Sequence, residues 1–360
     1  MRELKLLKGN EAIAEAAIRY GVDGYFGYPI TPQSEIMETL MELKPWEDTG
    51  MVVLQAESEV ASINMLYGGA GCGKKVMTSS SSPGISLMQE GLSYIAGAEL
   101  PCVVVNVVRG GPGLGTIQPA QSDYLQAVKG GGHGDYNLIV LAPASVQEMA
   151  DFVKLAFELA FKYRNPAMIL SDGIIGQMME KVELDNYVPR WTDEEVKQMH
   201  PWASTGKPAS RPRNIITSLT LESTEMEKHN RKLQAKYRQI EAEEVRYETF
   251  SCDDAEYLLV AYGSSARICQ KVVEIAREKG VKLGLLRPIT LFPFPAGAIA
   301  RLADKVKGIL SVEMSAGQMV QDIRLAVNGK IKVEHYGRLG GIVPTPGEVI
   351  EALKQKLIGG

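Results

Sequence analysis

The apolar run at residues 101–108 limits what this chain can fold into more than any other feature. Valine fills most of its positions, and apolar and polar residues do not alternate along it. A strand of this kind is buried on both faces, which is typical of a parallel sheet covered by helices. Segments with helical spacing separate it from shorter apolar runs at 24–28, 51–55, 75–78, 138–141 and 167–170. Roughly the first 185 residues are therefore predicted to form a doubly wound, mostly parallel sheet.

The alternation of strands and helices stops in the middle of the chain and then resumes. Prolines punctuate a polar stretch after residue 185, and residues 221–246 form a charge-rich helical pattern. This pattern fits a solvated connecting helix, or a helix that lies on a partner subunit. Strand and helix patterns return from residue 255 onward. We therefore predict an α/β protein with two doubly wound, mostly parallel-sheet domains at 1–185 and 251–360, joined by a helical linker at 186–250.

The composition excludes several classes of function. The chain is 45% hydrophobic and 23% charged, with a net charge of −4 and no basic block, which argues against nucleic-acid binding. No apolar run is long enough to span a bilayer, and the first residues lack the apolar core of a signal peptide, so we expect a cytoplasmic protein without a membrane partner. The cysteines at 72, 102, 252 and 269 lie too far apart for zinc or iron–sulfur spacing. We predict no metal site in this chain, and any electron carriers should reside on another chain.

The turn at residues 28–34 follows the first predicted strand and leads into a helix. Open α/β sheets bind their ligands at this carboxyl end of the strands. Pro29 and Pro32 make the turn stiff, Thr31 and Ser34 can cap the helix, and Pro32 suits its first position. The turn is thus either a rigid, well-capped connection or a site where Thr31 and the helix N-terminus face a small anion.

Glu59 lies at the start of a predicted helix that follows the strand at 51–55. The apolar residues Val60, Ile63 and Leu66 place it near the buried end of that helix, whereas Glu57 should cap or face solvent. A carboxyl group sheltered in this way can hold or share a proton. The alternative is an ordinary acidic residue in the first turn of a helix.

Arg109 directly follows the buried run and precedes the glycine-rich residues 110–115. A guanidinium among glycines that let a ligand approach is suited to gripping a carboxylate, although a surface ion pair is an equal alternative. The glycine-rich segment lacks the ending of a phosphate-binding loop, so a free-standing nucleotide-binding protein is a weak rival. Asp172-Gly173 resembles half of a metal-diphosphate signature without the rest of it, and the serine run at 79–82 is expected to be a polar loop without a nucleophile.

Taken together, these segments resemble the α subunit of the 2-oxoacid:ferredoxin oxidoreductases over nearly the whole chain. The resemblance implies a thiamine-diphosphate pyrimidine-binding-like domain followed by a transketolase C-terminal-like domain. It rests on Gly9-Asn10-Glu11-Ala12, residues 28–34, 57–65 and 82–88, Arg109, Arg287-Pro288-Ile289-Thr290, Glu313-Met314 and Gly317-Gln318-Met319.

The resemblance also implies roles for individual residues. Glu59 would hydrogen-bond the pyrimidine ring of thiamine diphosphate and act as a catalytic residue, with Tyr28, Pro29 and Ile30 beside it in the cofactor site. Thr31 and Arg109 would hold the carboxylate and keto group of a 2-oxoacid.

The same resemblance implies partners. The cofactor would be shared with a β subunit that holds the diphosphate and Mg²⁺. Iron–sulfur clusters would lie on partner chains, including γ and ferredoxin-like δ subunits, with external ferredoxin as the electron acceptor and coenzyme A as co-substrate.

The segments at 32–34 and 79–84 look most like the branched-chain type of this family, which oxidises 3-methyl-2-oxobutanoate. Because one methylene contributes only about 1–3 kcal/mol to discrimination, pyruvate or 2-oxoglutarate remains open as the substrate, as do indolepyruvate and oxalate. A non-catalytic docking subunit of the same fold is a further alternative.

Overall fold

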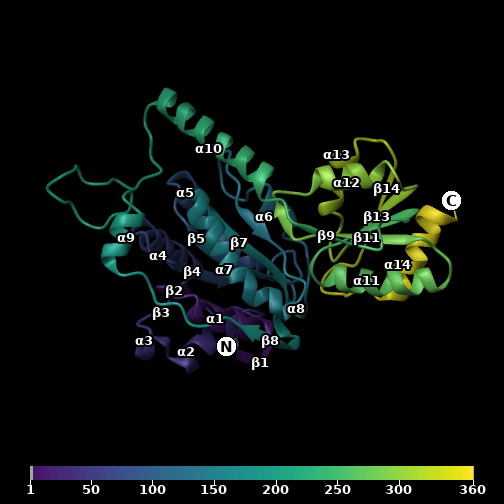
Figure 1. Cartoon of the computed structure of the whole chain (residues 1–360), viewed down its shortest axis with the longest axis horizontal. Coiled ribbons are helices and arrows are strands. Elements are labelled where there is room, and N and C mark those ends of the chain that lie inside the picture. Colours follow the sequence, from purple (N-terminus) through teal and green to yellow (C-terminus); the bar gives the residue numbers. More distant parts are fainter. Residues whose placement is uncertain (1–2, 360) are drawn as a thin grey trace.

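The computed structural model describes residues 3–359 and contains a large and a smaller α/β unit (Figure 1). The large unit is built on a seven-stranded sheet with the order β12-β6-β7-β5-β4-β2-β3. All its strands run parallel except β12, which is antiparallel to β6. The strands are β2 (Gly24–Gly27), β3 (Val52–Gln55), β4 (Val76–Ser80), β5 (Cys102–Val108), β6 (Ile139–Leu141), β7 (Pro166–Asp172) and β12 (Thr290–Phe292).

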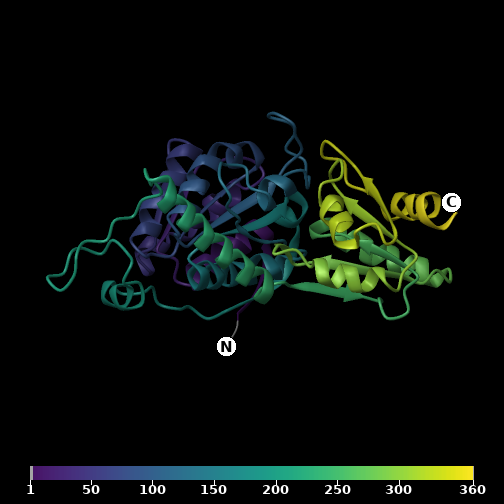
Figure 2. The same cartoon turned by 90° about the horizontal axis from the view of Figure 1, so that it is seen from above.

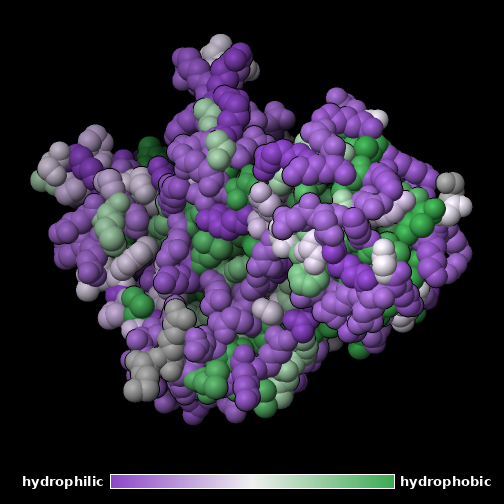
Figure 3. All heavy atoms as spheres, turned by 45° about the vertical axis from the view of Figure 1, so that its right-hand side comes forward, coloured by the Kyte–Doolittle hydropathy of each residue, from purple (hydrophilic) through white to green (hydrophobic). Residues whose placement is uncertain are grey.

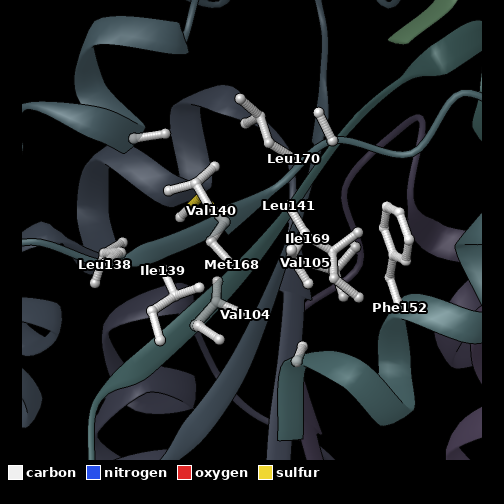
Figure 4. Packing of buried hydrophobic residues seen from close by; sticks show 14 of the residues in the cluster. Val104, Val105, Leu138, Ile139, Val140, Leu141, Phe152, Met168, Ile169 and Leu170 are labelled. Carbon is white, nitrogen blue, oxygen red and sulfur yellow. The ribbon is translucent and has the colours of Figure 1, made fainter. Parts of the chain in front are cut away.

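The central strand β5 has the burial that its sequence predicts, because each of its residues is buried. Val104 and Val105 pack with residues of β6 and β7 in the core of the large unit (Figure 4). Helix α1 packs against α2 and α7, and α4 packs against α5. The helices of this unit are α1 (Gly9–Arg19), α2 (Ser34–Leu43), α3 (Pro45–Asp48), α4 (Glu59–Gly71), α5 (Ser82–Gly97), α6 (Tyr124–Val128), α7 (Val146–Tyr163) and α8 (Gly173–Gln177).

The smaller unit has a five-stranded sheet with the order β14-β13-β10-β11-β9, in which only β9 is antiparallel to its neighbour. Its strands are β9 (Tyr247–Phe250), β10 (Tyr257–Val260), β11 (Leu283–Pro288), β13 (Gly308–Glu313) and β14 (Lys332–Gly337). Its helices are α11 (Gly263–Glu278), α12 (Ala296–Ala303), α13 (Met319–Val327), α14 (Pro346–Leu353) and the π-helical turn Lys354–Ile358. The α/β class with two mostly parallel sheets is therefore confirmed.

Four strands depart from the expected layout. Strand β9 lies inside the predicted linker but pairs with β11, and β12 lies inside the predicted second domain but joins the large sheet. The sequence patterns also gave no sign of the antiparallel pair β1 (Glu3–Lys8) and β8 (Met179–Leu184). The predicted boundaries at 185 and 250 thus remain a proposal, and β9 and β12 each pair with a strand on the other side of a predicted boundary.

The linker contains the short helix α9 (Asp193–Met199) and the long helix α10 (Ser223–Glu243). Helix α10 is exposed along most of its length and buries Leu233, Tyr237 and Ile240, so it lies on its own chain as a connecting helix (Figure 2). Nearer the start of the linker, the ammonium group of Lys75 lies between the rings of Tyr20 and Trp191, at 4.6 and 4.5 Å from their centres. These contacts attach the linker to the large unit.

The surface is mainly hydrophilic on the face shown in Figure 3, with hydrophobic residues in small groups. No helix within residues 3–359 has the length and hydropathy that a bilayer-spanning segment requires. The same residues contain no cluster of three or more histidine, cysteine or acidic side chains arranged to hold a metal ion.

Candidate functional site

The predicted site residues follow neighbouring strands of the large sheet. Thr31 follows β2, Glu59 follows β3 and Arg109 follows β5, and β4 lies between β2 and β5 in the sheet. Because these strands are parallel, their carboxyl ends meet at one edge of the sheet. The fold therefore brings the segments that carry the three residues to the same edge.

The turn before α2 differs in detail from the prediction. The helix begins at Ser34 with Gln33 as N-cap, so Pro32 is not in its first position, and neither Thr31 nor Ser34 caps it. The Thr31–Pro32 peptide bond is cis. Gln33 fixes the turn instead: its side-chain amide donates to the Tyr28 carbonyl (3.0 Å) and its backbone N–H donates to the Ile30 carbonyl (3.0 Å).

Buried polar side chains from the neighbouring strands hold this turn. Ser79 donates to the Gln33 side-chain oxygen at 2.5 Å and is itself bonded to the Tyr25 hydroxyl at 2.7 Å. From the other side, the Asn10 amide donates to the Pro32 carbonyl (2.8 Å) and to Glu35 (2.7 Å). The roles of the Asn10 and Gln33 side chains were not predicted, because only their tertiary contacts reveal them.

The turn presents its outer residues to solvent at the sheet edge. Thr31 and Pro29 are exposed, and Tyr28 and Ile30 are half-buried. Within the described residues, the Thr31 hydroxyl has no hydrogen-bond partner. Thr31 is thus free to bind a ligand from this side.

Arg109 is the residue that joins the segments of the site. Its guanidinium donates from Nη1 to the Thr31 carbonyl (3.0 Å) and from Nη2 to the Leu114 carbonyl (2.8 Å). Its backbone N–H donates to the Ser82 hydroxyl at 3.1 Å, which ties it to the start of α5. The surface ion pair is therefore not found among the described residues. Two of the five N–H groups of the guanidinium hold loops, and the Nε–H group is buried without a partner.

Glu59 is buried at the first position of α4, which Ser58 caps by accepting a hydrogen bond from the Ala61 N–H (3.2 Å). Its side chain is only 6% exposed, and within the described residues its carboxylate has no hydrogen-bond or ion-pair partner. Glu57 is exposed, as expected. Val60 is 47% exposed, so the expectation that it packs in the core is wrong, and the burial of Glu59 comes from contacts across α5.

Gly84 of α5 makes room for this carboxyl group. A Cβ atom on Gly84 would lie 2.5 Å from Oε1 and 2.8 Å from Cγ of Glu59, and closer still to the Ser80 hydroxyl. Ser80 and Ser81 are buried, and their hydroxyls have no partner among the described groups. Glu59 thus lies in a cradle beside Gly84 and the unpartnered Ser80 hydroxyl, where a ligand that offers hydrogen bonds would be bound strongly.

The serine run is not the loop that the sequence indicated. Ser79 and Ser80 end strand β4, Ser81 is the N-cap of α5, and Ser82 is its first residue. The run is therefore a strand-to-helix junction with its side chains turned into the site and the core.

Asp172 has a structural role at the junction of the two units. It caps α8 by accepting hydrogen bonds from the N–H groups of Ile174 (2.9 Å) and Ile175 (3.3 Å), and it accepts a further bond from the Ser264 hydroxyl. Burial raises the pKa of this carboxyl group. These bonds explain the Asp172-Gly173 pair without a metal ion.

Comparisons with known proteins agree with this geometry. Residues 15–249 match a family model described as pyruvate flavodoxin/ferredoxin oxidoreductase, thiamine diphosphate-binding. Residues 255–349 match a second model, pyruvate:ferredoxin oxidoreductase core domain II. The chain belongs to the 2-oxoacid:ferredoxin oxidoreductase family, as an α-type subunit.

Curated relatives of this family cover almost the whole chain. The ketoisovalerate oxidoreductase subunit VorB of Methanothermobacter thermautotrophicus is 50% identical over 98% of this chain and 97% of its own length. The 2-oxoglutarate synthase subunit KorA of Archaeoglobus fulgidus is 38% identical over 94% of this chain and 96% of its own length.

Solved structures show the same fold. The 2-oxoglutarate:ferredoxin oxidoreductase from Magnetococcus marinus, solved with 2-oxoglutarate, coenzyme A and succinyl-CoA bound, superimposes with a TM-score of 0.83 at 26% identity. This α-type chain covers 65% of that longer chain and is itself covered to 99%. A split-gene transketolase, at 12% identity and a TM-score of 0.61 over 98% of both chains, shares the fold alone.

Proposed function

We propose that this α-type subunit takes part in the oxidative decarboxylation of a branched-chain 2-oxoacid, best 3-methyl-2-oxobutanoate, to an acyl-CoA. The observation that carries the proposal is the buried, unpartnered carboxylate of Glu59 at the same sheet edge as Thr31 and Arg109. The substrate choice is supported by the higher identity to the ketoisovalerate subunit, 50% against 38% for a 2-oxoglutarate synthase subunit.

The residues present fit the pyrimidine end of thiamine diphosphate. The missing side chain of Gly84 lets the Glu59 carboxyl group pack against α5, and the buried Ser80 hydroxyl beside it offers a further hydrogen bond. Glu59 would hold the ring, and Tyr28, Pro29 and Ile30 would line the same site. The chemistry that thiamine diphosphate supplies when bound is an acidic ring carbon that can add to a 2-oxoacid carbonyl.

Three side chains of this subunit then bind and orient the cofactor ring and the substrate. The Glu59 carboxyl group would hydrogen-bond a ring nitrogen of the cofactor from its sheltered position at the start of α4. Arg109 binds the substrate carboxylate with the N–H groups that do not hold the Thr31 and Leu114 carbonyls. The Thr31 hydroxyl donates to the substrate keto oxygen, so the 2-oxoacid is oriented at two points.

The proposal includes partners. Within residues 3–359 this chain offers no metal cluster, so the diphosphate with Mg²⁺ and the iron–sulfur clusters are assigned to other subunits of β, γ and ferredoxin-like δ type. Ferredoxin receives the electrons, and coenzyme A takes the acyl group. The relatives support this assembly, since they are themselves named as subunits.

Replacement of Glu59 by Gln in the assembled complex tests the proposal. We expect dye reduction with 3-methyl-2-oxobutanoate and coenzyme A to fall by about 10²–10⁴-fold, because loss of a positioned acid–base group has an effect of this size. Glu57→Gln, two residues away and exposed, is the matched control and should keep its rate. If the E59Q complex stays intact and turns over as fast as the wild type, this chain is a docking subunit. If the wild-type complex reduces the dye faster with pyruvate or 2-oxoglutarate than with 3-methyl-2-oxobutanoate, only the choice of substrate is rejected.

A further inference from the structure

The segment that carries Arg109 leaves strand β5 and then returns beside it. Arg109 forms an antiparallel bridge with Pro119, and the Gly110 N–H donates to the Gln118 carbonyl at 2.9 Å. The outgoing limb continues the buried central strand of the large sheet, so the sheet fixes its position. The returning limb, residues 118–121, is therefore the second support of the loop at whose base Arg109 lies.

Gln121 ends the returning limb, and each of its polar groups bonds to the smaller unit. Its backbone N–H donates to the Met314 carbonyl (2.9 Å), and its backbone carbonyl accepts from the Tyr262 hydroxyl (3.2 Å). Its side-chain oxygen accepts from the Met314 N–H (3.0 Å) and from the Ser265 hydroxyl (2.7 Å). Its side-chain nitrogen donates to the Tyr262 carbonyl at 2.8 Å. With 2% of its surface exposed, Gln121 is a fully satisfied, buried connection between the two units.

The groups that bind Gln121 lie at the carboxyl ends of two neighbouring parallel strands of the smaller sheet. Tyr262 and Ser265 follow β10, and Met314 follows β13. Open α/β sheets bind their ligands at this edge, where backbone groups and helix ends are available. In this chain the edge of the smaller sheet holds a side chain of the large unit.

A second amide from the smaller unit holds the residues that come next. The Gln318 side-chain nitrogen donates to the Ser122 carbonyl (2.6 Å), and its side-chain oxygen accepts from the Leu125 N–H (2.8 Å). Gln318 is fixed in turn, because its backbone N–H donates to the fully buried Glu313 carboxylate at 2.9 Å. The smaller unit thus sets the course of the chain from residue 121 to residue 125.

The guanidinium of Arg109 depends on the same loop. Its Nη2 donates to the carbonyl of Leu114, in the middle of the loop, and its Nη1 donates to the Thr31 carbonyl. A shift of the returning limb moves Leu114 and with it one of the two carbonyl groups that orient the guanidinium. The direction of the Arg109 side chain is therefore coupled to contacts made by the smaller unit.

We propose that Gln121 is a positioning residue for Arg109, through which the smaller unit sets how tightly this subunit binds the carboxylate of a 2-oxoacid. The inference rests on the proposed function, in which Arg109 binds that carboxylate. An amide suits the task because it donates and accepts hydrogen bonds at one place without placing a second charge near the substrate.

Steady-state kinetics of the assembled complex test the proposal. Gln121→Met keeps the backbone bonds and most of the volume but removes the three side-chain hydrogen bonds. We expect the KM for 3-methyl-2-oxobutanoate to rise about 10–100-fold, the effect of weakening one hydrogen bond to a charged group. The kcat and the KM for coenzyme A should stay within about twofold of the wild type.

Arg267→Met is the matched control. Arg267 also joins the two units, by donating to the Ala144 carbonyl (3.0 Å) and to Glu180 (2.9 Å), but it contacts nothing between residues 109 and 125. General loosening of the junction would lower the unfolding free energy or kcat in both variants, whereas loss of positioning raises the KM for the 2-oxoacid in Q121M alone. A Q121M complex that loses kcat at an unchanged KM, or an R267M complex with the same rise in KM, overturns the proposal.

Arg109→Lys separates the failure of this inference from the failure of the proposed function. If Arg109 binds the carboxylate, R109K raises the KM by itself, and Q121M adds less than about twofold in the R109K background, because both changes act on one contact. An unchanged KM in R109K rejects the proposed role of Arg109 and this inference with it. A raised KM in R109K, together with no effect of Q121M or with its full effect in the R109K background, rejects this inference alone. Should Q121M fail to assemble, Gln318→Met is measured in its place, and an unchanged KM again rejects the inference.

Discussion

Replacing Gly84 by Ala should move the Glu59 carboxyl group without removing it, so the variant tests whether the position of this group matters for activity. The added methyl carbon would lie 2.5 Å from Oε1 and 2.8 Å from Cγ of Glu59. The same carbon would lie 2.0 Å from the Ser80 hydroxyl oxygen. Since a carbon and an oxygen in contact need about 3.5 Å, the Ser80 hydroxyl must move by about 1.5 Å and the Glu59 carboxyl group by roughly 1 Å. Overpacking of this kind costs about 1–3 kcal/mol of unfolding free energy, and the gain in helix propensity offsets about 1 kcal/mol of it.

The effect on activity should be larger than the effect on stability. A displacement of about 1 Å at a catalytic group can lower the rate about 10²-fold, so we expect a folded G84A complex with about 1% of wild-type dye reduction. Gly68→Ala on α4 is the control, because nothing lies within 4 Å of its added carbon. Urea unfolding and 2-oxoacid-dependent dye reduction are measured on both variants. A G84A complex within about threefold of the wild-type rate would refute the placement of Glu59 at the reacting end of the site.

Two further predictions concern stability. Burial lowers the pKa of Lys75 and of Lys236 to about 8, whereas an unfolded lysine keeps its proton to about 10.4. The unfolded state therefore binds more protons than the folded state between pH 8 and 9.5, so the free energy of unfolding should rise with pH in this window. In urea titrations at several pH values, K75M and K236M should each make this rise smaller. Glu313→Gln should lower unfolding free energy by about 1–3 kcal/mol, because its buried carboxylate accepts hydrogen bonds from the N–H groups of Gln318, Met319 and Val320 at 2.9, 2.9 and 3.0 Å at the start of α13. E278Q, at an exposed position near the end of α11, is the urea-unfolding control.

The sheet edge was predictable from sequence because parallel strands impose it. Once 24–28, 51–55 and 101–108 are read as parallel strands, the residues that follow them must meet at one edge, whatever the details of the loops. The family resemblance implied that Thr31 and Arg109 lie together, and the Arg109 guanidinium donates a 3.0 Å hydrogen bond to the Thr31 carbonyl. The roles of these residues toward cofactor and substrate stay predictions.

The features that escaped prediction depend on contacts between distant segments. Strand β1 pairs Glu3 with Leu184, and its outward residues Leu4 and Leu6 are 62% exposed, so no pattern of burial marks it in the sequence. Strand β12 reaches the large sheet from the other unit in the same way. Local periodicity reports which face of an element is buried, and it cannot report a partner more than a hundred residues away.

The difference between local patterns and distant contacts also explains why the stiff turn at residues 28–34 was predicted and the side chains that hold it were not. Two prolines reveal a stiff turn locally, but its position relative to Glu59 is set by Asn10 from α1 and by Gln33 and Ser79 through the end of β4. These amides and hydroxyls are buried and hydrogen-bonded to backbone or to one another, so they hold the turn at low conformational freedom without adding charge to the site. In the proposed site the charges that face the ligand are then those of Glu59 and Arg109, and these buried hydrogen bonds would hold the turn rigid before the ligand arrives.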